Sequence, residues 1–186
     1  MTWTRIVKLL CLSVFLLTAV SADAQNYVSK HIKVGIFSST PLEDIRAVSE
    51  KGSGVILIST REVVVQVPVR TLDFDRKLMQ EHFNENYIES EKYPLAKFKG
   101  KLDPGIDLSR DGEYTVNVSG VLSLHGVDKQ RTIPCKISIK AGVLSAESQF
   151  KVACADHKID IPKLVFTKIA EFINVKISGQ FNLLTK

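Results

Sequence analysis

Residues 114–134 read YTVNVSGVLSLHGVDKQRTIP, and this stretch decides the fold of the chain. Apolar and polar side chains alternate up to residue 124, a period of two that is typical of a β-strand with one buried and one solvated face. The apolar face comprises Tyr114, Val116, Val118, Leu122 and Leu124. His125 and Gly126 then form a turn signal, and a second alternating segment follows at once. We therefore predict two neighbouring antiparallel strands that form part of the wall of a β-barrel.

The same pattern extends over the rest of the chain. Eight segments have strand character and are bounded by turn residues, namely 27–37, 54–60, 62–71, 95–103, 113–124, 130–140, 144–154 and 171–184. Short connections such as Asp111-Gly112 and Ala141-Gly142 join consecutive segments, which favours antiparallel pairing over long crossovers. The prediction is an all-β fold, an eight-stranded antiparallel barrel. Two packed open sheets stay an alternative because alternation alone does not separate the two, although closure removes exposed strand edges.

Two helical insertions are expected between the strands. Thr40-Pro41-Leu42-Glu43 combines a capping residue, a proline at the first helical position and a capping-box glutamate, so we predict a short helix through about residue 50. A second helix is predicted from near Asp73 or Asp75 to before Tyr93-Pro94, since apolar residues recur there at near-helical spacing. We expect it to cover a mouth or a flank of the barrel.

The first 24 residues have the composition of an export signal. Two basic residues precede an apolar run at 9–20, and Ala22-Asp23-Ala24 fits the small-residue cleavage pattern. The run is shorter than the roughly 20 residues of a membrane-spanning helix. We therefore predict a signal peptide at 1–24, one mature domain at 25–186, and a periplasmic or secreted protein without an integral membrane span.

The charge pattern argues against nucleic acid as the partner. The chain carries 25 Lys and Arg against 20 Asp and Glu, a formal net charge of +5. Nucleic-acid binding would gather basic residues on one face with aromatic residues among them. Here lysines alternate along a strand, as at Lys97, Lys99 and Lys101, which is typical of a solvated outer sheet face.

Two cysteines, Cys135 and Cys154, remain after removal of the signal peptide, and export makes a disulfide between them chemically possible. If the chain reverses near Gly142, residues that face each other have numbers summing to about 283 to 285, whereas these two sum to 289. Their Cα atoms would then be farther apart than the roughly 7 Å that a disulfide tolerates. The register favours two separate apolar thiols over a disulfide.

Catalytic and metal-binding patterns are missing from the sequence. His31, His82, His125 and His157 follow no H-x-H, H-x3-H or cysteine-rich spacing, and we interpret them as single surface or turn residues. Gly52-Ser53-Gly54 lacks the flanking residues of a nucleophile elbow. We predict a protein that is not an enzyme and that uses no cofactor and no metal.

The inward side chains then become the candidate site. An eight-stranded barrel is just wide enough either to be filled by its own side chains or to hold one small ligand. Small inward residues such as Gly100, Gly120 and Ala146 leave room among larger ones, so composition leaves a hollow and a solid interior both open. The predicted wall residues are Phe98, Val116, Val118, Leu122, Ile137, Phe150, Val152, Ile177 and Phe181. The predicted lid or mouth residues are Leu78, Phe83, Ile161, Phe166 and Arg131.

Two motifs stand out by their order and spacing. One is Lys92-Tyr93-Pro94 followed by Phe98, and the other is the strand end Leu122-Ser123-Leu124-His125-Gly126-Val127-Asp128-Lys129. With them, nearly the whole mature chain resembles the YceI-like family of exported lipid- or polyisoprenoid-binding proteins. The resemblance implies a lipocalin-like barrel, an elongated apolar pocket for an isoprenoid or fatty chain, a periplasmic setting and no enzymatic activity. The chain departs from the family's pattern at residues 28–50 and at Asp128, where a hydroxyl residue is common.

The leading hypothesis is non-catalytic binding, sequestration or transport of a long apolar molecule, such as a polyisoprenoid, a fatty acid or an amide-like lipid. A polar head group at the mouth would meet Arg131 or Lys129, although a solvated charge is the simpler interpretation of both. The alternative is a solid-core module that binds another envelope protein and holds no small molecule. The sequence leaves the identity of the ligand and the oligomeric state, including a homodimer, open.

Overall fold

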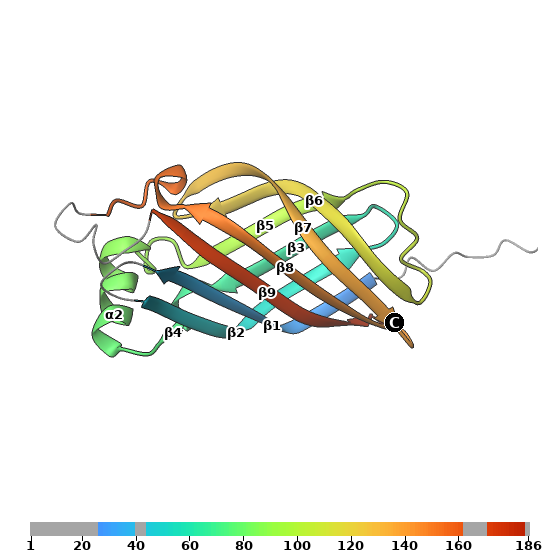
Figure 1. Ribbon diagram of the computed structural model, residues 1–186, viewed down its shortest axis with the longest axis horizontal. Helices are drawn as coiled ribbons and strands as arrows, with labels where there is room; N and C mark the ends of the chain where they lie inside the picture. The colour runs from blue at the N-terminus through green and yellow to red at the C-terminus, as the bar shows by residue number, and fades with distance from the viewer. Residues whose placement is uncertain (1–25, 40–43, 162–170, 185–186) are drawn as a thin grey trace, which may run out of the picture.

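The computed structural model describes residues 26–39, 44–161 and 171–184, which form a long barrel with a helix at one end (Figure 1). The strands are β1 (Asn26–Ser39), β2 (Asp44–Leu57), β3 (Glu62–Pro68), β4 (Asp73–Phe74), β5 (Leu95–Leu102), β6 (Gly112–Leu124), β7 (Val127–Lys140), β8 (Val143–Ala153) and β9 (Phe172–Leu183). The helical elements are η1 (Val69–Thr71), α2 (Lys77–His82), the π-helical turn η2 (Phe83–Tyr87) and η3 (Cys154–His157). Within these described ranges, no helix has the length and apolar character needed to cross a membrane.

Eight strands close the barrel. The long strands that are neighbours in the wall pair antiparallel, and β1 hydrogen-bonds to both β2 and β9, so the first and last strands complete the ring. The two-residue strand β4 pairs with β2 only at Ala47 and Val48. Closure satisfies the backbone groups that would otherwise be exposed on the edges of β1 and β9. The predicted eight-stranded antiparallel barrel is confirmed, and the alternative of two open sheets is wrong.

The predicted helix through residue 50 is wrong, because residues 44–50 belong to strand β2. Ala47 and Ser49 are buried, whereas the intervening Val48 is 39% exposed. A polar residue on the inner face and an apolar residue on the outer face therefore hide the period of two in the sequence. Pairing with β1 fixes the strand, and the capping signature at 40–43 lies outside the described residues.

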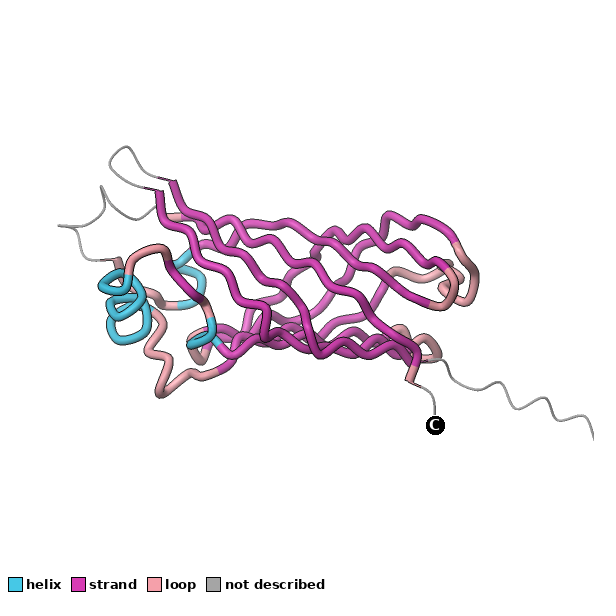
Figure 2. Tube along the Cα trace, turned by 90° about the horizontal axis from the view of Figure 1, so that it is seen from below, coloured by secondary structure: helices cyan, strands magenta, loops and turns pink. Residues whose placement is uncertain are grey.

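The second helical insertion is confirmed, but it is shorter than predicted. α2 and η2 lie across one end of the barrel, which we call the α2 end (Figure 2). Phe74, which the helical pattern had included, lies instead in β4 and contacts Phe83 with ring centroids 4.9 Å apart. Ala47, Leu72 and Phe74 form a small buried cluster that fixes this cap to the wall.

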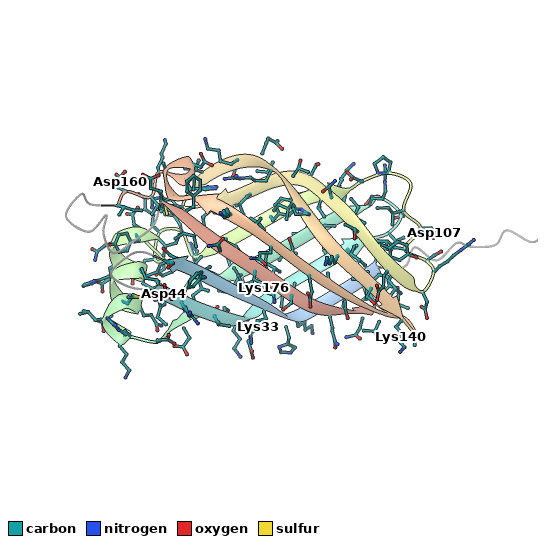
Figure 3. All side chains as sticks on the ribbon, in the orientation of Figure 1. Lys33, Asp44, Asp107, Lys140, Asp160 and Lys176 are labelled. Atoms are coloured by element: carbon teal, nitrogen blue, oxygen red, sulfur yellow. The ribbon has the colours of Figure 1, made fainter. Side chains whose placement is uncertain are left out.

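The inner and outer faces of the wall differ in polarity. On β5, Phe98 and Leu102 are buried, whereas the lysines at 97, 99 and 101 are exposed. Figure 3 shows charged side chains, among them Lys33 and Lys176, projecting from the outside of the barrel. The alternating lysines therefore form the solvated outer face that the sequence predicted, and the apolar residues face the interior.

Candidate ligand-binding cavity

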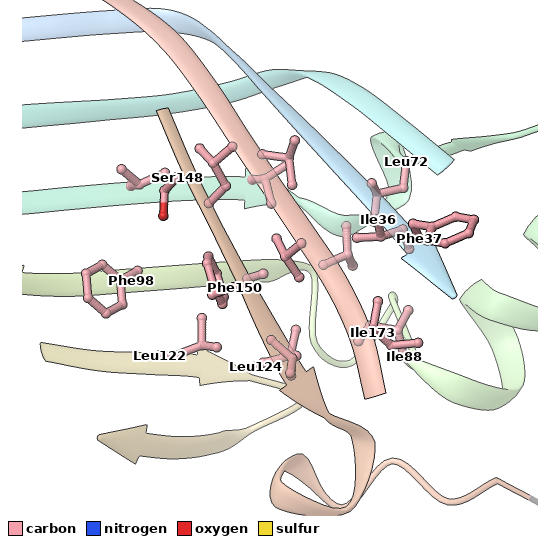
Figure 4. A pocket seen from close by; sticks show the side chains of 18 of the residues that line it. Ile36, Phe37, Leu72, Ile88, Phe98, Leu122, Leu124, Ser148, Phe150 and Ile173 are labelled. Carbon is pink, nitrogen blue, oxygen red and sulfur yellow. The ribbon is translucent and has the colours of Figure 1, made fainter. Parts of the chain in front are cut away.

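A cavity of about 530 Å³ lies inside the barrel, so the interior is hollow rather than packed solid. This volume falls within the roughly 300 to 1,000 Å³ that is typical of small-molecule sites. Apolar side chains from strands on several sides of the barrel line it, and Figure 4 shows Phe98, Leu122, Phe150 and Ile173 among them. The inner faces of the strands thus enclose one space rather than meeting in the middle.

Most of the predicted wall residues line this cavity. They are Phe98, Val118, Leu122, Ile137, Phe150, Val152, Ile177 and Phe181. The alternation in the later strands placed them on the inward face, which is where the structure has them. Val116 is the exception, since it is buried in the hydrophobic core but is not among the residues that line the cavity. Val116 therefore contributes to packing.

The predicted lid and mouth residues divide into three groups. Leu78, Phe83 and Ile161 line the cavity, and the 62% exposure of Leu78 shows that this side chain also meets solvent. Arg131 does not line the cavity, because its guanidinium donates to the carboxylate of Asp156 at 2.6 Å. Phe166 lies outside the described residues.

Sequence reasoning missed the part of the lining that comes from residues 34–74. Its apolar members are Val34, Ile36, Phe37, Ile45, Ile56, Val63, Val65, Val67, Val69, Leu72 and Phe74. In β3 the run EVVVQVP carries valine on both faces, so its apolar pattern does not identify the inward side. Pairing with β5 identifies the inward side of β3. Val63, Val65 and Val67 lie opposite Gly100, Phe98 and Ala96, and the faces of β5 are clear from its own alternation.

Two free thiols, Cys135 and Cys154, also line the cavity. Cys135 faces Ser148 across the β7–β8 ladder, which matches the predicted hairpin register and places Cys154 six positions further along the chain. Burial raises the pKa of Cys135 to about 11, and it also raises the pKa of Cys154. Both thiols therefore stay protonated near neutral pH and behave as small apolar wall residues.

The two motifs that carry the family resemblance meet in space beside the cavity. The ring of Tyr93 packs edge-on against that of His125, with centroids 4.6 Å apart. Gly126 follows in the β6–β7 turn with φ of +68°, and a Cβ there would lie only 2.5 Å from the Tyr93 ring. Only glycine fits both this backbone conformation and this contact. The two motifs thus contain the residues that pack the segment after η2 against the β6–β7 turn. We call this contact the joint.

His157 supports the same joint from inside. Its side chain is fully buried, and Nδ1 donates to the backbone carbonyl of Val127 at 3.2 Å. Burial lowers the pKa of His157, since removal from water penalises the charged imidazolium. His157 is therefore a neutral structural residue near neutral pH. Its interpretation as a surface or turn residue is correct for the turn, since it lies in the 3-10 turn η3, but its side chain is buried rather than at the surface.

The chemistry that the cavity offers is apolar contact. Its lining is mainly aliphatic and aromatic, with a few polar or charged residues, among them Gln66, Ser148, Arg76, His82 and Lys97. In the part of the chain that the structure describes, no three His, Cys, Asp or Glu side chains are grouped closely enough to hold a metal ion. Such a surface favours apolar ligands, because their apolar surface is removed from water in the cavity.

Comparison with known proteins is consistent with this architecture. Among solved structures, the chain is similar to a polyisoprenoid binding domain from Saccharophagus degradans implicated in plant cell wall breakdown, with a TM-score of 0.74, 14% identity, and coverage of 87% of this chain and 100% of that one. It is similar to Burkholderia cenocepacia BcnA, with a TM-score of 0.64, 13% identity, and coverage of 80% and 95%. It is also similar to the YceI protein of Campylobacter jejuni, with a TM-score of 0.58, 14% identity, and coverage of 74% and 84%.

At such low identities these likenesses show a shared fold. A search of curated proteins gives no significant match. The family-level evidence comes from the sequence itself, because residues 26–181, nearly all of the described barrel, match the YceI-like domain. The chain therefore belongs to the family of proteins with a YceI-like domain.

Proposed function

We propose that this protein binds a long apolar molecule non-covalently inside its barrel and thereby sequesters or transports it. Candidate ligands are a polyisoprenoid, a fatty acid or an amide-like lipid. The single observation that carries the proposal is the apolar cavity within a closed wall. A structural relative described as a polyisoprenoid binding domain supports the same class of ligand.

The burial of hydrocarbon supplies enough free energy for useful affinity. Each buried methylene contributes about 0.8 kcal/mol, so ten of them give a gross gain of about 8 kcal/mol. That gross gain corresponds to a dissociation constant of about 1 μM before the costs of association and ordering are subtracted. A long chain is needed to overcome those costs, which is why a long ligand suits this cavity better than a short one.

The proposed role is non-catalytic and periplasmic. Burial raises the pKa of the two thiols in the lining and so favours their protonated, less nucleophilic form, which supports a binding role. The support for export is the composition of residues 1–24. Expression of the full chain in a bacterial host, followed by fractionation and intact-mass measurement, tests this location. Cleavage after Ala24 and recovery from the periplasm are expected, and a full-length protein in the cytoplasm would contradict it.

Binding is tested with two variants that place the same side chain on opposite faces of β8. Ala146 lines the cavity, whereas its neighbour Glu147 is exposed on the outside. We expect Ala146→Phe to fill part of the cavity and to weaken binding of cis-parinaric acid or geranylgeraniol by about tenfold or more. Glu147→Phe should bind like the native protein.

Native mass spectrometry and organic extraction of the exported protein complete the test. Organic extraction of the native protein should release an apolar molecule. The amount released from the Ala146→Phe variant should be smaller. Recovery of no apolar molecule, together with no uptake of either added probe, would refute the proposed function. Equal binding by both variants would place the ligand outside the barrel.

A further inference from the structure

One joint of the barrel wall is incomplete. The ladder between β7 and β8 runs only from Lys140↔Val143 to Cys135↔Ser148. Toward the α2 end, β7 stays paired with β6 as far as Val127, and β8 stays paired with β9 as far as Ala153. In this region β7 (residues 127–134) pairs only with β6, and β8 (residues 149–153) pairs only with β9. Figure 1 shows the β7 and β8 ribbons separating. We call these two segments the β7–β8 seam.

Pro134 explains why the ladder stops where it does. It is the first residue beyond the last pair, and its carbonyl accepts a hydrogen bond from Ser148 Oγ at 2.7 Å, so this side of Pro134 faces β8. In an antiparallel ladder every second facing pair exchanges both N–H···O=C bonds, and a residue whose carbonyl points at the neighbouring strand belongs to such a pair. Proline has no N–H to donate, so the next bond of the ladder cannot form.

Side chains, rather than backbone bonds, hold the seam shut. η3 follows β8 and reaches back to β7, where the carboxylate of Asp156 accepts from Arg131 at 2.6 Å. His157 Nδ1 donates to the carbonyl of Val127. The side chains of Arg131 and Asp156 are 26% and 44% exposed, so this ion pair is within reach of water. A partly exposed pair is far easier to break than a continuous strand ladder.

The cavity lies directly behind the seam. Three seam residues line it, namely Ile133 of β7 and Phe150 and Val152 of β8. On either side of the seam the wall is continuous, because the β6–β7 ladder spans the whole of β6 and the β8–β9 ladder spans the whole of β8. An opening at the seam therefore exposes the part of the apolar interior beside residues 127–134 and 149–153. Entry at the α2 end instead passes Leu78 and Phe83.

We propose that the β7–β8 seam is the entrance through which a long apolar ligand enters and leaves the barrel sideways, with the Arg131–Asp156 pair as its latch. The proposal rests on the proposed function, since it assigns the route to the same cavity. The extended chain slips between the two strands when η3 lifts. The equilibrium affinity is set by the cavity wall, and the seam sets the rates of uptake and release.

The first experiment staples the seam. Pro134→Cys and Gln149→Cys are introduced together into the mature chain, in a background with Cys135→Ala and Cys154→Ala. Because the two positions follow the last pair of the ladder, a disulfide there fixes the strands together. We expect oxidation to slow stopped-flow uptake of cis-parinaric acid by about tenfold or more, and reduction to restore it. A control staple, Lys136→Cys with Glu147→Cys, joins an existing outward pair and should leave the rate unchanged.

The second experiment closes or opens the seam without a disulfide. Pro134→Val restores the missing donor and should slow uptake. Asp156→Asn removes the latch charge and should speed both uptake and release, while Glu50→Gln, which breaks the Lys33–Glu50 pair on the opposite outer wall, should not. Unchanged rates in the oxidised staple, in Pro134→Val and in Asp156→Asn would overturn the seam as the entrance while leaving the cavity as a site. Absence of probe binding in the native protein would instead overturn the proposed function.

Discussion

The carboxylate of Glu89 lies 2.8 Å from Nε2 of His125, which joins two residues 36 positions apart in the chain. The other ring nitrogen of His125, Nδ1, lies 2.9 Å from the backbone carbonyl oxygen of His157. Both ring nitrogens therefore lie within hydrogen-bond distance of an oxygen, one from a side chain and one from the backbone. One imidazole therefore connects the segment after η2, the β6–β7 turn and η3.

Removing this imidazole should loosen all three segments. We expect His125→Ala to lower the free energy of unfolding by about 2 to 3 kcal/mol, because a hydrogen-bonded ring that is only 10% exposed and its contact with Tyr93 are lost. Urea denaturation followed by circular dichroism measures the change. His31→Ala, at an exposed position on β1, is the control and should change stability by less than about 0.5 kcal/mol. Equal losses in the two variants would show that His125 has no special role.

Stability should depend on pH through His157. Burial lowers its pKa in the folded protein, while the unfolded chain keeps the ordinary value of 6.5. The unfolded state therefore takes up a proton first as the pH falls, so the stability that depends on neutral His157 is complete above pH 6.5 and declines below it. His157→Gln keeps a donor for Val127 but does not titrate. Its unfolding free energy should fall less than that of the native protein between pH 7.5 and pH 5.5, and equal falls would contradict this account.

The thiol of Cys135 should react slowly. Its pKa of about 11, against an ordinary value of 9.0, lowers the thiolate fraction at pH 8 by about a hundredfold. Reaction of the mature Cys154→Ala variant with a disulfide reagent at pH 8 should be slower than that of free cysteine by at least this factor. A bound apolar molecule should slow it further, since Cys135 lines the cavity. A rate similar to that of free cysteine would show that this part of the wall is open to water.

Gly120 should be intolerant of a side chain. A Cβ at this position would overlap the backbone carbonyl of Lys99 on the neighbouring strand β5, which cannot yield as a side chain can. We expect Gly120→Ala to cost about 3 kcal/mol or more in unfolding free energy. At Gly35 the nearest atom to an added Cβ is 4.0 Å away, so Gly35→Ala should stay within about 1 kcal/mol of the native protein. Thermal or urea denaturation of both variants decides the matter, and similar losses would contradict the close approach of β5 and β6.

The later strands could be predicted from the sequence because their two faces differ in chemistry. In β6, buried Val116 and Val118 alternate with exposed Thr115 and Asn117, so the period of two is plain. The same reasoning placed Phe150 and Phe181 on the inner face, and both line the cavity. Where one face of a strand is solvated and the other is buried, the alternation in the sequence shows directly which side chains point inward.

The prediction failed where a strand has a polar residue on its buried face and an apolar residue on its exposed face. β2 buries Ser49 and exposes Val48, so its pattern resembled neither a strand nor a clean helix, and a local capping signature was followed instead. The hydroxyl of Ser49 is satisfied by the Thr71 side chain at 2.6 Å, a partner 22 positions away that no local pattern reveals. The role of His157 was missed for the same reason, since its burial depends on β7.

The pairing of β1 with β9 has a consequence for the order of events during synthesis. These strands are the first and last of the barrel, and the ring is complete only when they meet. Such distant partners close slowly, because the loop entropy is lost before their contacts form. The ligand chamber therefore does not exist in a nascent chain that still lacks residues 172–183. A ligand can be enclosed only after residues 172–183 have been synthesised and β9 has paired with β1.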